Sequence, residues 1–83
     1  MDKKIKIYAL STCIWCKKTI EYFKNKNVKF EHIFVDTQDE AMQEKLFKEI
    51  EKVNPKVNFP TILINDTIIV GYDTKKFDEE LKK

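Results

Sequence analysis

The fold is decided by one stretch, residues 5–23, which reads IKIYALSTCIWCKKTIEYF. Its first part alternates apolar and polar positions among strand-forming residues and predicts a strand at residues 5–9. Its last part spaces the apolar residues for one helix face and predicts a helix over residues 13–26. Cys13 and Cys16, the two cysteines of the 83-residue chain, therefore lie at a strand-to-helix turn.

A Cys-x-x-Cys pair has three interpretations: a redox-active dithiol, half of a tetrahedral zinc site, or two unrelated buried thiols. The position at the start of a helix favours redox chemistry. Cys16 lies one turn after Cys13 and its side chain points back along the helix, so we expect it to be shielded. A shielded second thiol suits a resolving role, in which it attacks the mixed disulfide formed by the first.

Cys13 is the predicted nucleophile. Ser11 and Thr12 are good N-cap residues, so the helix begins at or beside Cys13, where backbone N–H groups lack intrahelical partners. These groups, the helix dipole and the charges of Lys17 and Lys18 all stabilise a thiolate there. We therefore expect the Cys13 pKa to fall below the value of about 8.5 of a free cysteine.

The rest of the chain alternates strands and helices. Residues 30–35 form a second strand, parallel to the first, and residues 36–40 cap a helix that ends at Asn54-Pro55. Residues 59–64 and 67–70 form a hairpin, and a last helix follows a cap at Asp73 or Thr74. The apolar residues of the middle helix, which we expect in the core, are Met42, Leu46, Phe47, Ile50 and Val53.

Length and charge restrict the classes of function that we expect for this chain. Residues 1–83 are expected to form a single domain. The formal net charge is only +2 and the charges are interspersed, which disfavours nucleic-acid binding. There is no apolar signal segment and no apolar run long enough for a bilayer, so we expect no membrane association and a cytoplasmic location. We also expect a monomer.

Three motifs together resemble the glutaredoxin family: Cys13-Ile14-Trp15-Cys16, then Phe59-Pro60-Thr61, then Val70-Gly71-Tyr72-Asp73. The resemblance covers nearly the whole chain. It implies a thioredoxin-like α/β fold, with a four-stranded mixed sheet in the order β-α-β-α-β-β-α flanked by three helices. It also implies a thiol-disulfide oxidoreductase that reduces disulfides in proteins or small molecules.

The resemblance assigns residues to substrate binding. The family's matching proline is cis and lies beside the dithiol, so that the backbone of Phe59 is free to pair with an extended substrate. Trp15 is either an apolar contact for substrate or a packing residue. Lys17, Thr61 and the backbone of residues 72–74 are candidates for a carboxylate site. The complete predicted set is Thr12, Trp15, Lys17, Phe59, Pro60, Thr61, Gly71, Tyr72 and Asp73.

Two departures from the family pattern bear on the electron donor: Leu10 stands where a lysine is common, and Val70 replaces the first of two glycines. A third departure, Ile14-Trp15 in place of the usual Pro-Tyr, is expected to shift the helix start and the balance between thiolate and disulfide. The donor is therefore either glutathione or, as in similar small redoxins that serve ribonucleotide reductase, thioredoxin reductase. Disulfide-containing proteins are the expected partners, and no tightly bound cofactor is expected.

Two other function classes are compatible with the sequence. In the first, Cys13 and Cys16 bind a metal, either with His32 in one chain or by pooling four cysteines from two chains around zinc or an iron–sulfur cluster. In the second, the chain is a non-catalytic interaction module on the same fold. A carboxylate-based hydrolase is not supported, because Asp36, Asp66 and Asp73 fall at predicted helix caps and turns.

Overall fold

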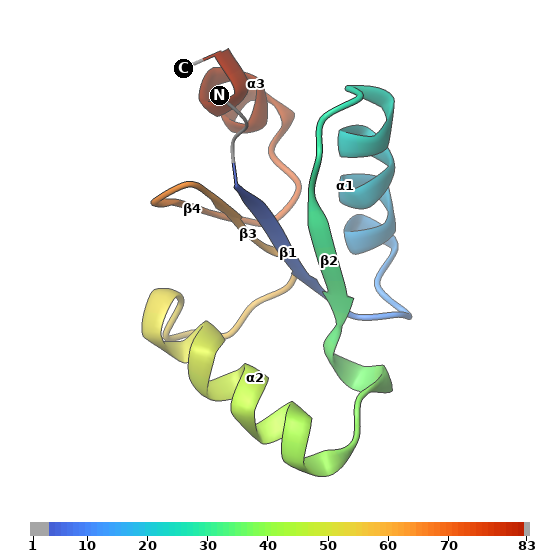
Figure 1. Cartoon of the computed structure of the whole chain (residues 1–83), viewed down its shortest axis with the longest axis vertical. Coiled ribbons are helices and arrows are strands. Elements are labelled where there is room, and N and C mark those ends of the chain that lie inside the picture. Colours follow the sequence, from blue (N-terminus) through green and yellow to red (C-terminus); the bar gives the residue numbers. More distant parts are fainter. Residues whose placement is uncertain (1–3, 83) are drawn as a thin grey trace.

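A computed structural model describes residues 4–82 and shows a central four-stranded sheet. The strand order across the sheet is β2-β1-β3-β4 (Figure 1). β1 pairs in parallel with β2 and antiparallel with β3, and β3 pairs antiparallel with β4. The strands are β1 (Ile5–Ala9), β2 (Glu31–Phe34), β3 (Thr61–Ile64) and β4 (Thr67–Val70).

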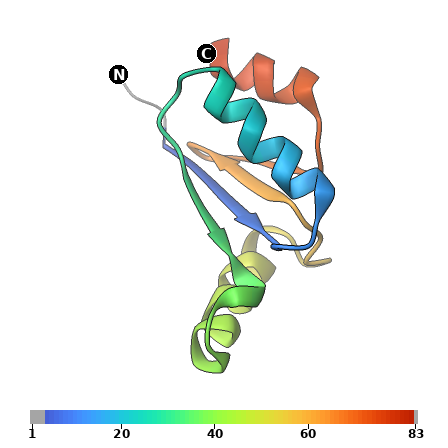
Figure 2. The same ribbon diagram turned by 90° about the vertical axis from the view of Figure 1, so that its right-hand side faces the viewer.

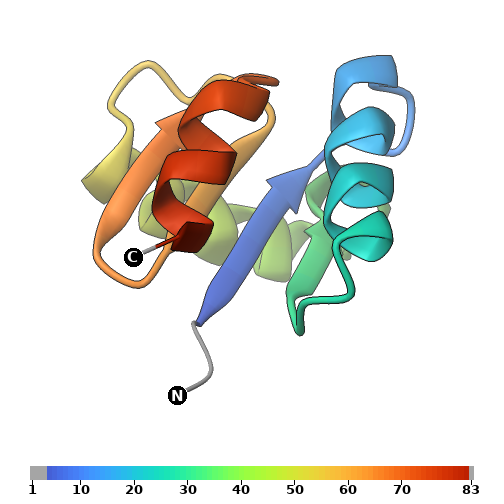
Figure 3. The same cartoon turned by 90° about the horizontal axis from the view of Figure 1, so that it is seen from above.

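Helices cover both faces of the sheet. Figure 3 shows α1 and α3 over one face, with α2 behind the sheet on the other. The parallel pair β1 and β2 is connected through α1, which is the crossover that parallel strands require. The helices are α1 (Ile14–Asn25), α2 (Glu40–Val53) and α3 (Thr74–Lys82). The predicted β-α-β-α-β-β-α order and mixed four-stranded sheet are confirmed.

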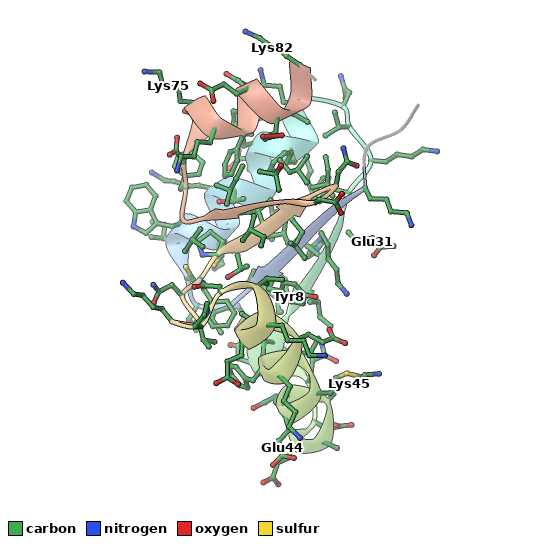
Figure 4. All side chains as sticks on the ribbon, turned by 90° about the vertical axis from the view of Figure 1, so that its left-hand side faces the viewer. Tyr8, Glu31, Glu44, Lys45, Lys75 and Lys82 are labelled. Atoms are coloured by element: carbon green, nitrogen blue, oxygen red, sulfur yellow. The ribbon has the colours of Figure 1, made fainter. Side chains whose placement is uncertain are left out.

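The core has two parts because the sheet has two covered faces. On the α1 and α3 face, Phe23 and Phe77 are fully buried with ring centroids 5.0 Å apart. Burying a side chain of this size contributes about 1.5–3 kcal/mol, so this contact fixes α3 on α1. On the other face Leu46 and Ile50 of α2 pack against Tyr8, which Figure 4 labels where the sheet meets α2.

The second strand is shorter than its predicted range, residues 30–35, whereas the segment predicted to cap the middle helix, residues 36–40, contains the observed cap. The second strand ends at Phe34, and Val35 already belongs to a 3₁₀ turn, Val35–Thr37, in which it is completely buried. The cap of α2 is Asp39, whose carboxylate accepts the Met42 N–H at 2.8 Å.

The prediction that every apolar residue of α2 lies in the core is wrong. Met42 is 37% exposed and Phe47 39% exposed. Of this helix, Leu46 and Ile50 are the buried residues, since they lie one turn apart on the face toward the sheet. None of the helices within residues 4–82 has the length and apolar composition needed to span a membrane.

Candidate functional site

Cys13 lies at the boundary between the loop after β1 and α1. It is itself the N-cap of the helix, with extended backbone (φ −87°, ψ 115°), so the predicted capping by Ser11 or Thr12 is wrong. Its Sγ accepts the backbone N–H of Cys16 at 3.3 Å. A cysteine in this role brings its sulfur to the first backbone N–H groups of the helix and to the positive end of the helix dipole.

Cys16 differs from Cys13 in burial. It is completely buried, among core residues that include Ile20 and Phe23, whereas Cys13 is half-buried; both are free thiols. Burial, followed by the hydrogen bond with Cys13, raises the pKa of Cys16 to about 12. Cys16 is therefore a protonated thiol at neutral pH, next to the half-buried Cys13.

The loop before β3 reaches the same end of the sheet. The register pairs Tyr8 with Thr61, so that Pro60 lies beside the end of β1, close to where Cys13 follows. Figure 2 shows the start of α1 near the loop that leads into β3. The Phe59-Pro60 peptide bond is cis, and Cys13 and Phe59 pack against the same core cluster. The sheet ladder begins only at Thr61, so the Phe59 backbone lies outside it.

An aromatic wall, made of Trp15 and Tyr72, borders the dithiol. The two rings lie 5.7 Å apart at 32°, and the Lys18 ammonium lies 4.8 Å from the Trp15 ring. Trp15 is 53% exposed and Ile14 beside it 62%. Two roles were predicted for Trp15, substrate contact and packing, and the structure is compatible with both. The ring packs on Tyr72, and its exposed surface remains available to a substrate.

The other residues predicted to bind substrate, Thr12, Lys17, Gly71 and Asp73, have different structural surroundings. Thr12 and Lys17 are exposed, and Lys17 lines a shallow groove between α1 and β2 together with His32. Gly71 has a left-handed backbone (φ +88°) and donates its N–H to the Pro60 carbonyl at 2.8 Å. Asp73 accepts the Lys76 N–H at 3.2 Å and caps α3.

Thr61 cannot bind a ligand through its side chain. The residue is completely buried, and its hydroxyl donates to the Asn58 carbonyl at 2.6 Å. It also accepts from the Asn54 amide at 3.4 Å. Its predicted part in a carboxylate site is thereby limited to its backbone, because the hydroxyl serves the loop that carries Pro60.

The structure does not bring together the three ligands of the one-chain metal hypothesis among the residues it describes. Within residues 4–82 there is no group of three or more His, Cys, Asp or Glu side chains placed to hold a metal ion. His32 lies instead on the exposed surface of β2, between the rings of Phe30 and Phe34 at 6.0 and 5.4 Å. The two-chain version of that hypothesis stays a prediction.

Sequence reasoning missed a contact between Ser11 and Asp36. Asp36 does not cap α2; its carboxylate binds the Ser11 N–H at 2.8 Å and the Ser11 hydroxyl at 2.5 Å. These bonds, the hydroxyl first, hold the pKa of Asp36 below its usual range. One signal could have found the pair: both residues follow parallel neighbouring strands, whose carboxyl ends lie at the same edge of a sheet.

Comparison with protein families agrees with this geometry. The glutaredoxin family model matches residues 5–69. The chain is 39% identical over 79 residues to an uncharacterised glutaredoxin-like 8.6 kDa protein in the rubredoxin operon of Clostridium pasteurianum, covering 95% of this chain and 99% of that one.

Solved structures agree as well. Methanoredoxin of Methanosarcina acetivorans has a TM-score of 0.92 and 42% identity, covering 96% of this chain and 85% of that one. The glutaredoxin grx-1 of Archaeoglobus fulgidus has a TM-score of 0.91 and 27% identity, covering 98% and 88%.

Proposed function

Since this chain belongs to the glutaredoxin family, we propose that it is a thiol-disulfide oxidoreductase that uses both of its cysteines. Cys13 is the nucleophile and Cys16 the resolving thiol. The difference in exposure between the two sulfurs carries this proposal: one caps the helix at the surface, and the other is completely buried one turn behind it.

In the first step the Cys13 thiolate attacks one sulfur of a target disulfide. A Cys13–target S–S bond forms, the target's own S–S bond breaks, and its second sulfur leaves with the electron pair and takes up a proton from water. Cys16 keeps its proton during this step, because its pKa is raised to about 12. A protonated thiol is a poor nucleophile, so Cys16 does not compete with Cys13 for the target disulfide.

In the second step Cys16 loses its proton to solvent and attacks the Cys13 sulfur. The target leaves as a dithiol, and Cys13 and Cys16 remain as a disulfide. The Cys13 charge and hydrogen bond are two of the causes that raise the Cys16 pKa. Both are lost once Cys13 is bonded to the target, so mixed-disulfide formation itself makes the Cys16 proton easier to remove.

The target binds between the Pro60 loop and the aromatic wall. An extended substrate pairs with the Phe59 backbone, which lies outside the sheet ladder. The exposed ring of Trp15 and the half-exposed ring of Tyr72 supply an apolar surface beside the reacting sulfurs. Proteins that carry an accessible disulfide are the proposed substrates.

Two serine variants test the mechanism. Each replaces one cysteine of the pair, so that the two variants can be compared as matched single substitutions. Cys16→Ser should accumulate a one-to-one mixed disulfide with a cyclic peptide disulfide, visible by intact mass. Cys13→Ser should form no adduct and should reduce the peptide more than a hundredfold more slowly than the wild type. Equal peptide reduction by Cys13→Ser and wild type would disprove the mechanism.

The electron donor is tested separately. Two electrons must come from an external thiol system to restore the dithiol, and glutathione and thioredoxin reductase with NADPH are the two proposed sources. The oxidised protein is mixed with each, and its free thiols are counted over time by alkylation. Faster recovery with glutathione assigns the donor to glutathione, and recovery only with the reductase assigns it to that enzyme.

A further inference from the structure

The two positions between the cysteines carry the most exposed large apolar side chains within residues 4–82. Ile14 is the most exposed of them and Trp15 the next. Tyr72, the second ring of the aromatic wall, extends this surface because it lies against Trp15. Single exposed apolar residues are common on proteins, whereas adjacent ones beside a reactive group are typical of a surface that binds a partner.

A positive charge is held at the edge of this surface. The Lys18 ammonium lies 4.8 Å from the centroid of the Trp15 ring, one helical turn further along α1, in a cation–π contact. Within residues 4–82 no carboxylate forms a salt bridge with Lys18. An ammonium has three N–H donors, so Lys18 can rest on the indole and still bind an anion from another molecule.

The charges near the dithiol are mostly positive. Figure 3 shows α1 and α3 beginning at the same end of the sheet, and the first turn of each helix contains no acidic residue. The carboxylates at this end are engaged within the chain, since Asp36 binds Ser11 and Asp73 caps α3. Four exposed lysines lie in the starts of the two helices: Lys17, Lys18, Lys75 and Lys76. Charge complementarity therefore favours an acidic partner.

We propose that the targets of this protein carry acidic residues and an apolar residue beside the reactive cysteine, and that Lys18 is the residue that selects them. The apolar residue of the target lies against Ile14 and the aromatic wall, and a carboxylate of the target pairs with the Lys18 ammonium. This inference rests on the function proposed above and names the substrate class of the same site.

The test compares linear peptides that differ only in charge. Each peptide has a single cysteine, activated as a mixed disulfide with 2-thiopyridine, a leucine beside it, and either glutamates or lysines on both flanks. In a Cys16→Ser background the Cys13 thiolate attacks the peptide sulfur and a Cys13–peptide S–S bond forms. Pyridine-2-thione leaves with the electron pair and takes up a proton, and its absorbance gives the rate.

The acidic peptide should react about threefold to tenfold faster than the basic peptide at low salt, and about 0.5 M sodium chloride should reduce this ratio. Lys18→Glu should bring the ratio to one or invert it, and Lys18→Gln should give an intermediate value. Because the ratio compares two peptides on one protein, any general effect of Lys18 on the reactivity of Cys13 cancels. Lys45→Glu on α2, labelled in Figure 4, makes the same charge change and should leave the ratio unaltered.

The apolar contact is tested in the same way. Replacing the leucine of the acidic peptide by serine should slow its reaction, and Ile14→Ser should remove most of the advantage of leucine. Ile68→Ser is the matched control, because Ile68 is also an exposed isoleucine but lies on β4. Equal loss of the leucine advantage in both variants would contradict the contact with Ile14.

Equal rates with the acidic and basic peptides, or an unchanged ratio in Lys18→Glu, would overturn the inference. The proposed function is judged by a different result. The reaction with activated peptides requires only an accessible Cys13 thiol, so it decides the role of Lys18 even if the wild type leaves a cyclic peptide disulfide unreduced. In that case the dithiol function alone fails.

Discussion

Cys13 and Cys16 carry the same side chain, and their different chemistry comes entirely from where the helix begins. Because α1 starts at Ile14, Cys13 is the cap and its sulfur accepts a backbone N–H, while Cys16 falls on the helix face that packs into the core. Two residues, Ile14 and Trp15, thus separate a half-buried cysteine from a completely buried one. At the residue scale, the functional distinction is a matter of burial and hydrogen bonding.

The raised pKa of Cys16 predicts a loss of stability in alkaline solution. In the reduced protein the unfolded chain loses this proton near pH 9.0, whereas the folded protein keeps it until about pH 12. A group with a raised pKa contributes its full stability below pH 9.0 and loses it as the pH rises through this interval. The free energy of unfolding should therefore fall above pH 9, by at most about 1.4 kcal/mol per pH unit.

Urea unfolding of the reduced protein at pH 8, 9 and 10 measures this fall. Cys16→Ala is the control, and it should lack the fall between pH 9 and 10. Tyr22 has a pKa raised from 10.0 to about 12, first by burial and then by its bond to Asp78, and contributes above pH 10 in both proteins. Equal slopes in both proteins between pH 9 and 10 would show that Cys16 is not the cause.

At the scale of elements, the segment between α2 and β3 is held by a buried polar network. The Asn54 side-chain amide donates to the Thr61 hydroxyl and to the Asn58 carbonyl, both at 3.4 Å, and the Thr61 hydroxyl closes the network on Asn58. Asn54 is also the C-cap of α2. The network therefore links the end of a helix to the loop that presents Pro60 to the dithiol.

Removing this network should both destabilise the protein and slow catalysis. Asn54→Ala leaves the buried Thr61 hydroxyl and the Asn58 carbonyl with fewer partners, at a cost of about 1–3 kcal/mol. It should also reduce the rate of peptide reduction several-fold, because the Pro60 loop loses an anchor. Urea unfolding and the peptide assay measure the two effects.

Asn58→Ala is the matched control for Asn54→Ala. Asn58 contributes only its backbone carbonyl to the network and its side chain is exposed, so this substitution should change stability by less than about 0.5 kcal/mol. An equal loss in the two variants would mean that the side chain of Asn54 does not hold the loop.

The elements themselves could be predicted because each has a strong local signal. The alternation before Cys13, the turn at Asn65 with its positive φ of 54°, and the helical spacing of Leu46 and Ile50 all correspond to observed structure. Contacts between loops left no such local signal. The bond between Ser11 and Asp36 joins residues 25 positions apart, and only the assembled parallel pair brings them together.

Side-chain burial was predicted least well where the fold covers a surface incompletely. Met42 and Phe47 have helical spacing typical of core residues, yet both are exposed. Periodicity indicates which residues share a helix face, whereas the area of sheet beneath that face decides how many of them are buried. That area depends on the tertiary arrangement, which a single helix does not specify.

At the scale of the whole molecule, the two faces of the sheet carry hydrophobic clusters of different size. Among residues 4–82, ten buried residues form the cluster on the α1 and α3 face, and four form the cluster on the α2 face. Because α2 contributes only Leu46 and Ile50 to the buried set, it has the least apolar contact to lose on opening. We therefore expect the molecule to open locally at α2 before it unfolds globally.

Native-state hydrogen exchange tests this order. Amides of α2 should exchange with an opening free energy at least about 1 kcal/mol below that of β1 and β3, which are the two central strands. Leu46→Ala should increase exchange in α2 more than in β1, whereas Phe23→Ala should increase exchange throughout the chain. Equal protection of α2 and β1 would show that the two faces unfold as one unit.

Trp15 gives the molecule an optical property that follows from its place in the aromatic wall. It is the only tryptophan of the chain, it lies between the two cysteines in sequence, and Tyr72 and Lys18 hold its ring at the surface. A disulfide formed next to an indole quenches its fluorescence, and a bound peptide changes the polarity around it. The emission of the unlabelled protein should therefore follow each half of the reaction in real time.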